Sequence, residues 1–351
     1  MDVTSQLIQI SSWTALAFLF TLLLTPLYLK LAEKFKLGKQ IRTEAMSGEK
    51  SSIFTEMHAK KTGTPTMGGL IMWGSVLLVI LLSRSLSLMG LIDQSLLQRG
   101  EIYLPLFTLI TMGILGAVDD YFNIKQFRGN KGIKATPKMF FLIFFAVLGA
   151  WWFYYKLGYT SIHLPKVGDF DIGIWYIPLF ILVIVSTANA VNITDGLDGL
   201  AGGLLLLAYA AFGIIAFAKG HFVLTIFCGL MMGSLMAFLW NNVPPAKFYM
   251  GDTGSLAYGA TLGVIAMMID SLPVLIIVGG IFIIETLSVL IQLTSKKYFK
   301  KKVFLIAPLH HHFERKGWGE AKVTMRFWII GSIFAVAGVI IGLLGMGIHY
   351  D

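Results

Sequence analysis

The chain has 351 residues, of which 56% are hydrophobic and only 13% are charged, and its formal net charge is +9. Soluble globular domains contain about 25% charged residues, so this composition excludes an ordinary soluble protein. The apolar runs are continuous rather than alternating, which indicates a helical membrane protein and not a β-barrel. The single cysteine, Cys228, excludes a disulfide framework and a cysteine-based metal site. The positive charge does not by itself indicate a nucleic-acid partner, because in a membrane protein the distribution of Lys and Arg between the connections is interpreted first.

Apolar runs of membrane-spanning length predict an all-α integral membrane protein of about ten transmembrane helices, in a single domain over residues 1–351. The first run follows neither a basic region nor a cleavage site, so we expect it to be retained as a helix. The connection 159–173 predicts a short external hairpin, with His163 as a surface residue. The ten runs cover about residues 11–32, 67–83, 103–118, 138–156, 174–190, 200–218, 222–240, 255–270, 273–295 and 327–347.

The distribution of basic residues predicts the orientation in the membrane. Alternate connections contain 23 of the 28 Lys and Arg residues, and the other connections contain Arg84, Arg99, Lys156, Lys166 and Lys219. Connections rich in Lys and Arg face the cytoplasm. We therefore expect both termini outside, and nearly all polar motifs at the cytoplasmic face.

The most polar of these motifs is the stretch 186–203, STANAVNITDGLDGLAGG, between two apolar runs. Asn189, Asn192, Asp195 and Asp198 follow one another at three-residue steps, which on a helical path places them on one face. Ionisable groups at the end of a membrane helix indicate a functional site. The alternative is a polar turn that only connects two helices.

Three further stretches carry polar groups suited to phosphate or metal. In HAKKTGTPTMGG (58–69), glycines beside lysines could present N–H groups to a phosphate, or Thr66 could cap a helix. Asp119 and Asp120 end an apolar run, where adjacent carboxylates call for a nearby cation or base. Asp252 precedes a helix in GDTGS, so it could bind Mg²⁺ beside an anion-binding helix start, or serve only as an N-cap.

The ninth apolar run and the connection after it hold the remaining polar groups. Gly279 and Gly280 permit a bend before the intramembrane residue Glu285. His310 to His312 could bind metal, or hydrogen-bond to phosphate or carboxylate. The lysines between 296 and 302 could anchor the chain to anionic lipid. Carboxylates, lysines and glycine turns at one membrane face together favour Mg²⁺-assisted phosphoryl transfer between a lipid and a cytosolic substrate.

Six motifs extend this interpretation into a family resemblance that covers nearly the whole chain. The chain resembles the muramoyl-pentapeptide branch of the polyprenyl-phosphate N-acetylhexosamine-1-phosphate transferases. The aspartate motifs fit the wider superfamily, whereas GTPTMGG and the three histidines point to that branch. The motifs are GTPTMGG (63–69), DDYFN (119–123), NAVNITDGLDGLAGG (189–203), FYMGDTGSLA (248–257), ETLSVLIQ (285–292) and APLHHHFERKGW (307–318).

The resemblance implies ten helices around a cytoplasmic-face cleft in the bacterial inner membrane, often as a homodimer. It implies transfer of phospho-MurNAc-pentapeptide from UDP-MurNAc-pentapeptide to undecaprenyl phosphate, giving lipid I and UMP, with Mg²⁺ on Asp252. Catalytic roles are expected for Asp119, Asp120, Asp252 and His310. Substrate-binding roles are expected for Lys61, Thr66, Lys138, Asn189, Asn192, Asp195, Asp198, Asn242, Tyr249, Gly251, Gln292, His311 and His312.

Three other functions stay open from the sequence. A GlcNAc-1-phosphate transferase would share the aspartates but have a different last cytoplasmic connection. A transporter or lipid flippase is compatible with ten helices and Glu285, although the polar residues gather at one face rather than the midplane. A structural scaffold would not need these polar clusters. Within the transferase interpretation, direct attack by the lipid phosphate is favoured over a covalent aspartyl-phosphate, because a phosphomonoester is already mostly dianionic at neutral pH.

Overall fold

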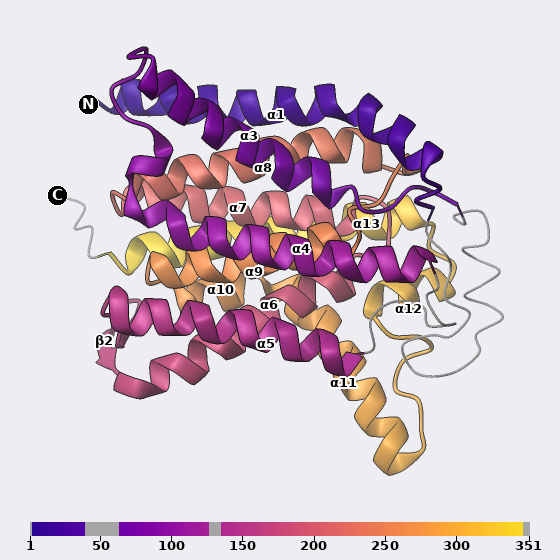
Figure 1. Ribbon diagram of the computed structural model, residues 1–351. Coiled ribbons are helices and arrows are strands. Elements are labelled where there is room, and N and C mark those ends of the chain that lie inside the picture. Colours follow the sequence, from indigo (N-terminus) through magenta and orange to yellow (C-terminus); the bar gives the residue numbers. More distant parts are fainter. Residues whose placement is uncertain (1, 39–62, 126–134, 347–351) are drawn as a thin grey trace.

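The computed structural model describes residues 2–38, 63–125 and 135–346, and it is a bundle of long helices (Figure 1). The start of α1 and the end of α13 lie at one end of the bundle, and α12 lies at the other. The helices are α1 (Val3–Lys34), α3 (Gly69–Leu88), α4 (Tyr103–Lys125), α5 (Ala135–Trp151), α6 (Tyr176–Thr194), α7 (Leu200–Ala218), α8 (Phe222–Asn242), α9 (Gly251–Met268), α10 (Leu272–Val278), α11 (Gly280–Phe299), α12 (Leu309–Arg315) and α13 (Glu320–Leu344).

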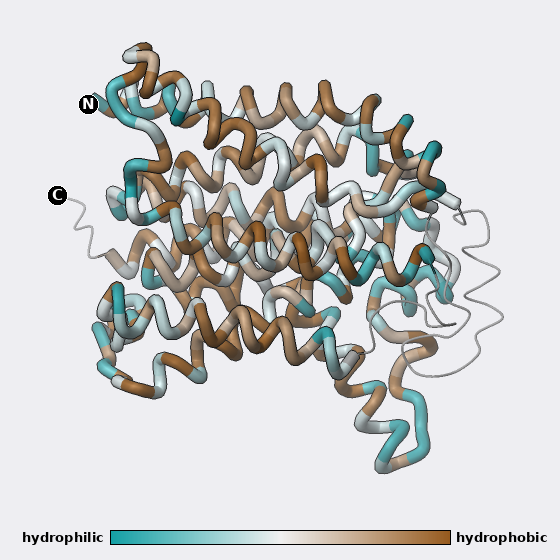
Figure 2. Tube along the Cα trace, viewed as in Figure 1, coloured by the Kyte–Doolittle hydropathy of each residue, from teal (hydrophilic) through white to brown (hydrophobic). Residues whose placement is uncertain are grey.

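The structure confirms the helical membrane class but not the count of ten spans. Eight helices within the described residues are long and apolar enough to cross a bilayer, and α10 with α11 would make a ninth span if the bent pair counts as one. The predicted run 255–270 corresponds to α9, which is not among these eight helices. Along the tube in Figure 2, hydrophobic residues dominate the middle of the helices and hydrophilic residues gather toward their ends, as a bilayer requires.

The predicted bend in the ninth run is present. α10 ends at Val278 and α11 begins at Gly280, and their axes differ by 75°. As a result, α11 runs obliquely away from the other helices (Figure 1). Its first half nevertheless stays packed, and Glu285 is fully buried.

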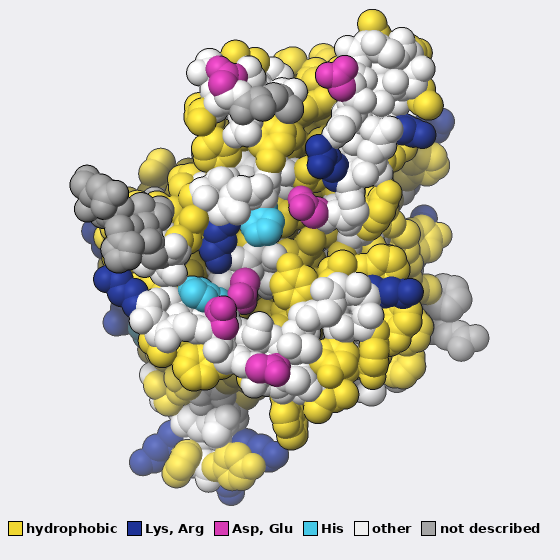
Figure 3. Space-filling model, turned by 90° about the vertical axis from the view of Figure 1, so that its left-hand side faces the viewer, with side chains coloured by type: hydrophobic (Ala, Val, Ile, Leu, Met, Phe, Trp, Pro, Cys, Tyr) yellow, Lys and Arg dark blue, Asp and Glu magenta, His cyan; other side chains and the backbone are white. Residues whose placement is uncertain are grey.

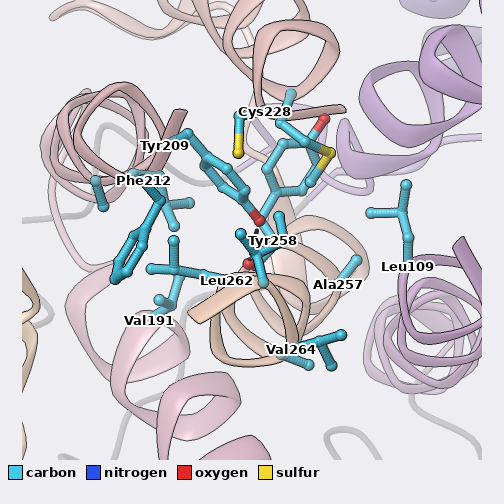
Figure 4. Packing of buried hydrophobic residues seen from close by; sticks show 14 of the residues in the cluster. Leu109, Val191, Tyr209, Phe212, Cys228, Ala257, Tyr258, Leu262 and Val264 are labelled. Atoms are coloured by element: carbon cyan, nitrogen blue, oxygen red, sulfur yellow. Dashed lines mark hydrogen bonds between the residues drawn. The ribbon is translucent and has the colours of Figure 1, made fainter. Parts of the chain in front are cut away.

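The core of the bundle is α9, in which every residue except Asp252 is buried. A helix that is apolar or small on all sides suits a position that is buried on all sides. The rings of Tyr258 (α9) and Tyr209 (α7) lie edge to face (Figure 4), and the Tyr209 hydroxyl donates to the Tyr258 carbonyl at 2.7 Å. The partners of α9 include α4 and α6, which approach its glycine-bearing faces.

We expect Gly259→Leu to destabilise the protein strongly, because α6 leaves no room for a side chain there. A Cβ at Gly259 would lie 2.7 Å from the Thr187 carbonyl oxygen, which is backbone and cannot rotate away. Overpacking of this kind costs about 1–3 kcal/mol or more. Thermal unfolding in detergent measures the effect. The control is Gly74→Leu on α3, where no atom lies within 4 Å of the added Cβ and the melting temperature should stay near that of the wild type.

The predicted hairpin is also present. β1 (Ser161–Leu164) pairs antiparallel with β2 (Gly168–Asp171), and His163 lies opposite Asp169. The hairpin lies at the end of the bundle where α1 begins and α13 ends, opposite the polar motifs described next (Figure 1).

Candidate active site

The first turn of α9 is the centre of the candidate site. Gly251 begins the helix with a φ of +68°, a conformation that glycine adopts without strain. A Cβ there would lie 2.3 Å from the Asp120 carboxylate and 2.8 Å from the Thr66 hydroxyl. α4 approaches just as closely, since a Cβ on Gly116 would lie 2.1 Å from the Asp252 carbonyl oxygen. These contacts bring Asp120 and Thr66 against the start of α9.

Asp120 lies on α4, is buried, and caps the N-terminal end of α9 with its carboxylate. Its carboxylate accepts hydrogen bonds from the Asp252 N–H (3.2 Å), the Thr253 N–H (3.0 Å) and the Thr253 hydroxyl (2.6 Å). A negative charge at a helix N-terminus is stabilising. The prediction that the start of α9 offers its N–H groups to a bound anion is therefore wrong for Asp252 and Thr253, because Asp120 already accepts from both.

Asp119 and Asp252 converge on one cation. The Lys138 ammonium donates to Asp119 Oδ2 at 3.0 Å and also to Asp252 Oδ2. The other Asp252 oxygen accepts from Asn192 Nδ2 at 2.7 Å, and the same amide donates to Ser255 at 2.8 Å. The side chain of Asp252 is 22% exposed and that of Asp119 is 4% exposed, so Asp252 is the more accessible of the two carboxylates.

The GTPTMGG stretch packs against the same helix start, but through its backbone. The Gly68 and Gly69 N–H groups donate to the carbonyls of Tyr249 and Met250, both at 2.9 Å, and the Tyr249 N–H donates to the Pro65 carbonyl at 2.8 Å. The hypothesis that the glycines of this stretch present N–H groups to a phosphate is therefore wrong for Gly68 and Gly69, because both groups are already bonded. Thr66 is buried, and its carbonyl accepts from the Tyr28 hydroxyl.

The polar stretch 186–203 is divided by the end of α6 at Thr194. Asn189 and Asn192 lie on the helix, and Asp195 is its C-cap residue. Asn192 contacts Asp252, whereas Asn189 Nδ2 donates to the Val185 carbonyl at 2.8 Å. The predicted single column of four side chains is therefore wrong, since the helix ends before Asp195 and Asp198 faces a different part of the chain.

Asp198 and Asn242 hold the segment that leads to α9. The Asp198 carboxylate accepts from the Ala246 N–H at 2.9 Å. Asn242 accepts from the Gly199 N–H at 2.9 Å and donates to the Phe248 carbonyl at 2.8 Å, and both residues are buried. These contacts make both residues supports for the site, and their predicted contact with substrate has no direct support in this geometry.

A second buried cluster joins the histidines to α11. His310 is fully buried. Its ring nitrogen Nδ1 lies 2.9 Å from Glu285 Oε2, and its backbone N–H donates to Glu285 Oε1 at 3.1 Å. The other ring nitrogen, Nε2, has no partner within the described residues. It faces the turn after α6, because a Cβ on Gly196 would lie 2.3 Å from it. The end of α6 therefore contacts both clusters.

The other predicted residues of this region stabilise the segment between α11 and α12. Gln292 is buried, accepts from the Val303 and Phe304 N–H groups at 3.0 Å, and donates to the Phe304 carbonyl at 3.0 Å. His312 Nδ1 accepts a hydrogen bond from the Leu305 N–H at 3.1 Å. Partial burial, together with the nearby charge of Lys316, lowers the pKa of His312. His311 is buried beside Glu314, with 2.6 Å between Nδ1 and Oε2.

Two residues of the site could not be identified from the sequence, and one predicted residue lies outside the part of the chain that the structure describes. Lys61 lies outside the described residues, so its predicted role stays a prediction. Thr253 and Ser255 bond to Asp120 and Asn192, but their sequence signal is no stronger than that of an ordinary helix start. Glu285 could have been included among the site residues from its intramembrane position alone.

The fold and site define a polytopic helical membrane protein with a carboxylate-rich site at one end of the bundle. Residues 102–270 match the family described as Glycosyl transferase family 4. A phospho-N-acetylmuramoyl-pentapeptide-transferase of Clostridium botulinum (strain Eklund 17B / Type B) is 40% identical over 97% of this chain and 99% of its own length. The same name is given to a relative from Oceanobacillus iheyensis, 40% identical over 97% of this chain and 99% of its own length. A third, from Geobacillus sp. (strain WCH70), is 39% identical over 93% of this chain and 95% of its own length.

The chain therefore belongs to the phospho-N-acetylmuramoyl-pentapeptide-transferase family. This confirms the resemblance drawn from the six motifs. It also disfavours the transporter and scaffold alternatives, since these full-length relatives are transferases by name.

Proposed function

We propose that this protein transfers phospho-MurNAc-pentapeptide from UDP-MurNAc-pentapeptide to undecaprenyl phosphate, giving lipid I and UMP. The names of its full-length relatives support the reaction. The observation that carries the proposal is the convergence of Asp119, Asp252 and Lys138 at the start of α9, beside Asn192. Phosphoryl transfer to an anionic acceptor needs positive charge and hard oxygen ligands in one place.

We propose Mg²⁺ as the cofactor, held by Asp252 with Asp119 beside it. The donor set fits this ion, because both carboxylates already point at one positive charge, the Lys138 ammonium. Mg²⁺ is commonly bound by one or two protein carboxylates together with substrate phosphates. When bound, the ion would neutralise charge on the diphosphate and polarise its oxygens.

The side chains of the chain itself have separable tasks in a direct transfer. The attacking oxygen belongs to the lipid phosphate, whose second pKa of about 6 leaves it mostly dianionic at neutral pH. Asp119 accepts the remaining proton or orients that phosphate. Lys138 reduces the repulsion between the two anionic substrates, and Asn192 holds Asp252 in position. An aspartyl-phosphate intermediate is unnecessary for this sequence of events.

The membrane orientation is part of the same proposal. The bias of Lys and Arg between alternate connections supports a cytoplasmic location for the site and an outer location for both termini. The hairpin would then lie outside. The homodimer expected from the family resemblance stays a prediction.

UMP release by purified protein tests the proposal, with UDP-MurNAc-pentapeptide as donor and undecaprenyl phosphate as acceptor. We expect release that requires both substrates and stops when EDTA removes the divalent cation. UDP-GlcNAc as donor should give little release. Equal turnover of UDP-GlcNAc would move the assignment to a GlcNAc-1-phosphate transferase, and release without the lipid acceptor would revive the covalent intermediate.

We expect Glu285→Gln to lower the rate of transfer by about 10²-fold, because it removes the carboxylate that orients a buried histidine. Both Glu285 oxygens bond to His310, one to its N–H and one to its ring. A carboxamide keeps one acceptor but introduces an NH₂ group where the carboxylate oxygen lay. Steady-state rates of UMP release measure the change. The matched control is Glu101→Gln, an exposed residue before α4 that should leave the rate unchanged.

A further inference from the structure

A separate polar cluster lies at the hairpin end of the bundle, away from the candidate active site. His163 of β1, Asp169 of β2 and Asp270 of the turn after α9 each offer a ligand atom, and these atoms lie within 4.8 Å of one another. Within the described residues, no other group of three or more His, Cys, Asp or Glu side chains meets this condition. Figure 3 views the molecule from this end and shows histidine side chains among acidic ones.

Three parts of the chain that are distant in sequence meet at this cluster. The hairpin register places His163 opposite Asp169, so their side chains are cross-strand neighbours. The backbone N–H of His163 donates to Asp270 Oδ1 at 3.1 Å, which joins the hairpin to the turn between α9 and α10. His163 Nε2 lies 3.2 Å from the Gly345 carbonyl oxygen at the end of α13.

The contacts of the imidazole decide which of its nitrogens is free to bind a ligand. A carbonyl oxygen only accepts, so Nε2 carries the hydrogen that bonds to Gly345. The other nitrogen, Nδ1, then points its lone pair at Asp169 Oδ1, which is only 2.6 Å away. As the side chains stand, a proton between these two acceptors accounts for that distance; to bind one Zn²⁺ ion, with bonds of about 2.0–2.2 Å, the two atoms would have to move apart by several tenths of an ångström.

The ligand atoms of the cluster suit a metal ion that replaces this proton. Among the described residues, the Lys219 ammonium lies near the cluster, and it is bonded to the carbonyls of Ile269 (2.6 Å) and Asp270 (3.1 Å). Two carboxylates against one ammonium leave a net negative charge that either a proton or a metal ion can balance. A histidine that donates its second N–H to a backbone carbonyl has the arrangement found in metal-binding histidines. One nitrogen and two carboxylate oxygens suit Zn²⁺ better than Mg²⁺ or Ca²⁺, which prefer oxygen alone.

We propose that His163, Asp169 and Asp270 form a Zn²⁺ site that fastens the hairpin to the rest of the bundle. The side chain of Asp169 is 69% exposed, which leaves an entry path and room for water as a further ligand. Because the ligands come from the hairpin and from the turn after α9, the ion would hold these segments together. The proposal does not depend on the transferase reaction.

Calorimetric titration of the untagged full-length protein with Zn²⁺, after treatment with a chelator, tests the site. We expect His163→Gln and Asp169→Asn each to weaken the tightest binding event by about 100-fold or more, since removal of even an outer-shell partner costs 10–100-fold. Zn²⁺ should also raise the melting temperature of the wild type but not of these variants. This second readout is independent of transferase activity.

Two matched substitutions control for unrelated zinc binding at the other histidines. His221→Gln changes a partly buried histidine in the turn before α8, and Asp171→Asn changes an exposed carboxylate of the same hairpin. Both should bind Zn²⁺ like the wild type. The proposal would be overturned if the wild type, His163→Gln and Asp169→Asn bound Zn²⁺ with equal affinity. It would also be overturned if the wild type showed no binding event beyond those of the two variants. In either case a proton, not a metal, joins His163 to Asp169.

Discussion

Asp252→Asn is expected to reduce UMP release by about 10³-fold while the protein stays folded. The substitution removes the charge that faces Lys138 and the oxygen proposed to hold Mg²⁺. It preserves an oxygen that can accept the hydrogen bond from Asn192, and it does not disturb the N–H groups bonded to Asp120. The loss should therefore fall on chemistry rather than on folding.

Rates and melting temperatures measured on the same preparations separate these two effects. The control is Asp93→Asn, an exposed carboxylate in the segment after α3, which should retain full activity. If the site binds Mg²⁺ through Asp252, the residual activity of Asp252→Asn should need a higher Mg²⁺ concentration than that of the wild type. A near-normal rate in this variant would remove Asp252 from the proposed mechanism.

Local sequence patterns were enough to predict the helices, the hairpin and the bend. Long apolar runs give helices because every backbone polar group must be paired inside a bilayer. Gly279 and Gly280 lie where the α10–α11 break occurs. The number of crossings was less predictable. α9 has 18 residues, but its polar, glycine-rich start lowers its mean hydropathy below that of the eight helices counted as crossings.

The site residues were predictable by type and region, but not by task. Asp120, Asp198 and Asn242 were all expected to contact substrate or metal, and each of them also bonds to a backbone group of another segment. The identity of such partners depends on tertiary packing, since Asp120 and Thr253 are far apart in sequence. The same reason explains why Gly68 and Gly69 resembled a phosphate loop, although their N–H groups are bonded to the segment before α9.

Asp119→Asn and Asp120→Asn are expected to separate catalysis from support within one adjacent pair. Both should lose most activity, but only Asp120→Asn should lower the melting temperature. The Asp120 carboxylate accepts from the Asp252 N–H, the Thr253 N–H and the Thr253 hydroxyl. A carboxamide turns an NH₂ group toward donors that then have no acceptor, and a buried unpaired group costs about 1–3 kcal/mol.

Asp119 has a different set of partners, and this leads to a different expectation. Lys138 bonds to Asp119 but also to Asp252, so Asp119→Asn leaves the ammonium paired and the bundle near its wild-type stability. If Asp119 only accepts the last proton of the lipid phosphate, the residual activity of Asp119→Asn should rise as the pH rises through about 6, the second pKa of a phosphomonoester, because the dianion needs no base. The wild type should show a weaker dependence over the same range. A residual rate that stays flat with pH would instead indicate that Asp119 orients the acceptor, and equal losses of melting temperature in both variants would contradict the division of tasks.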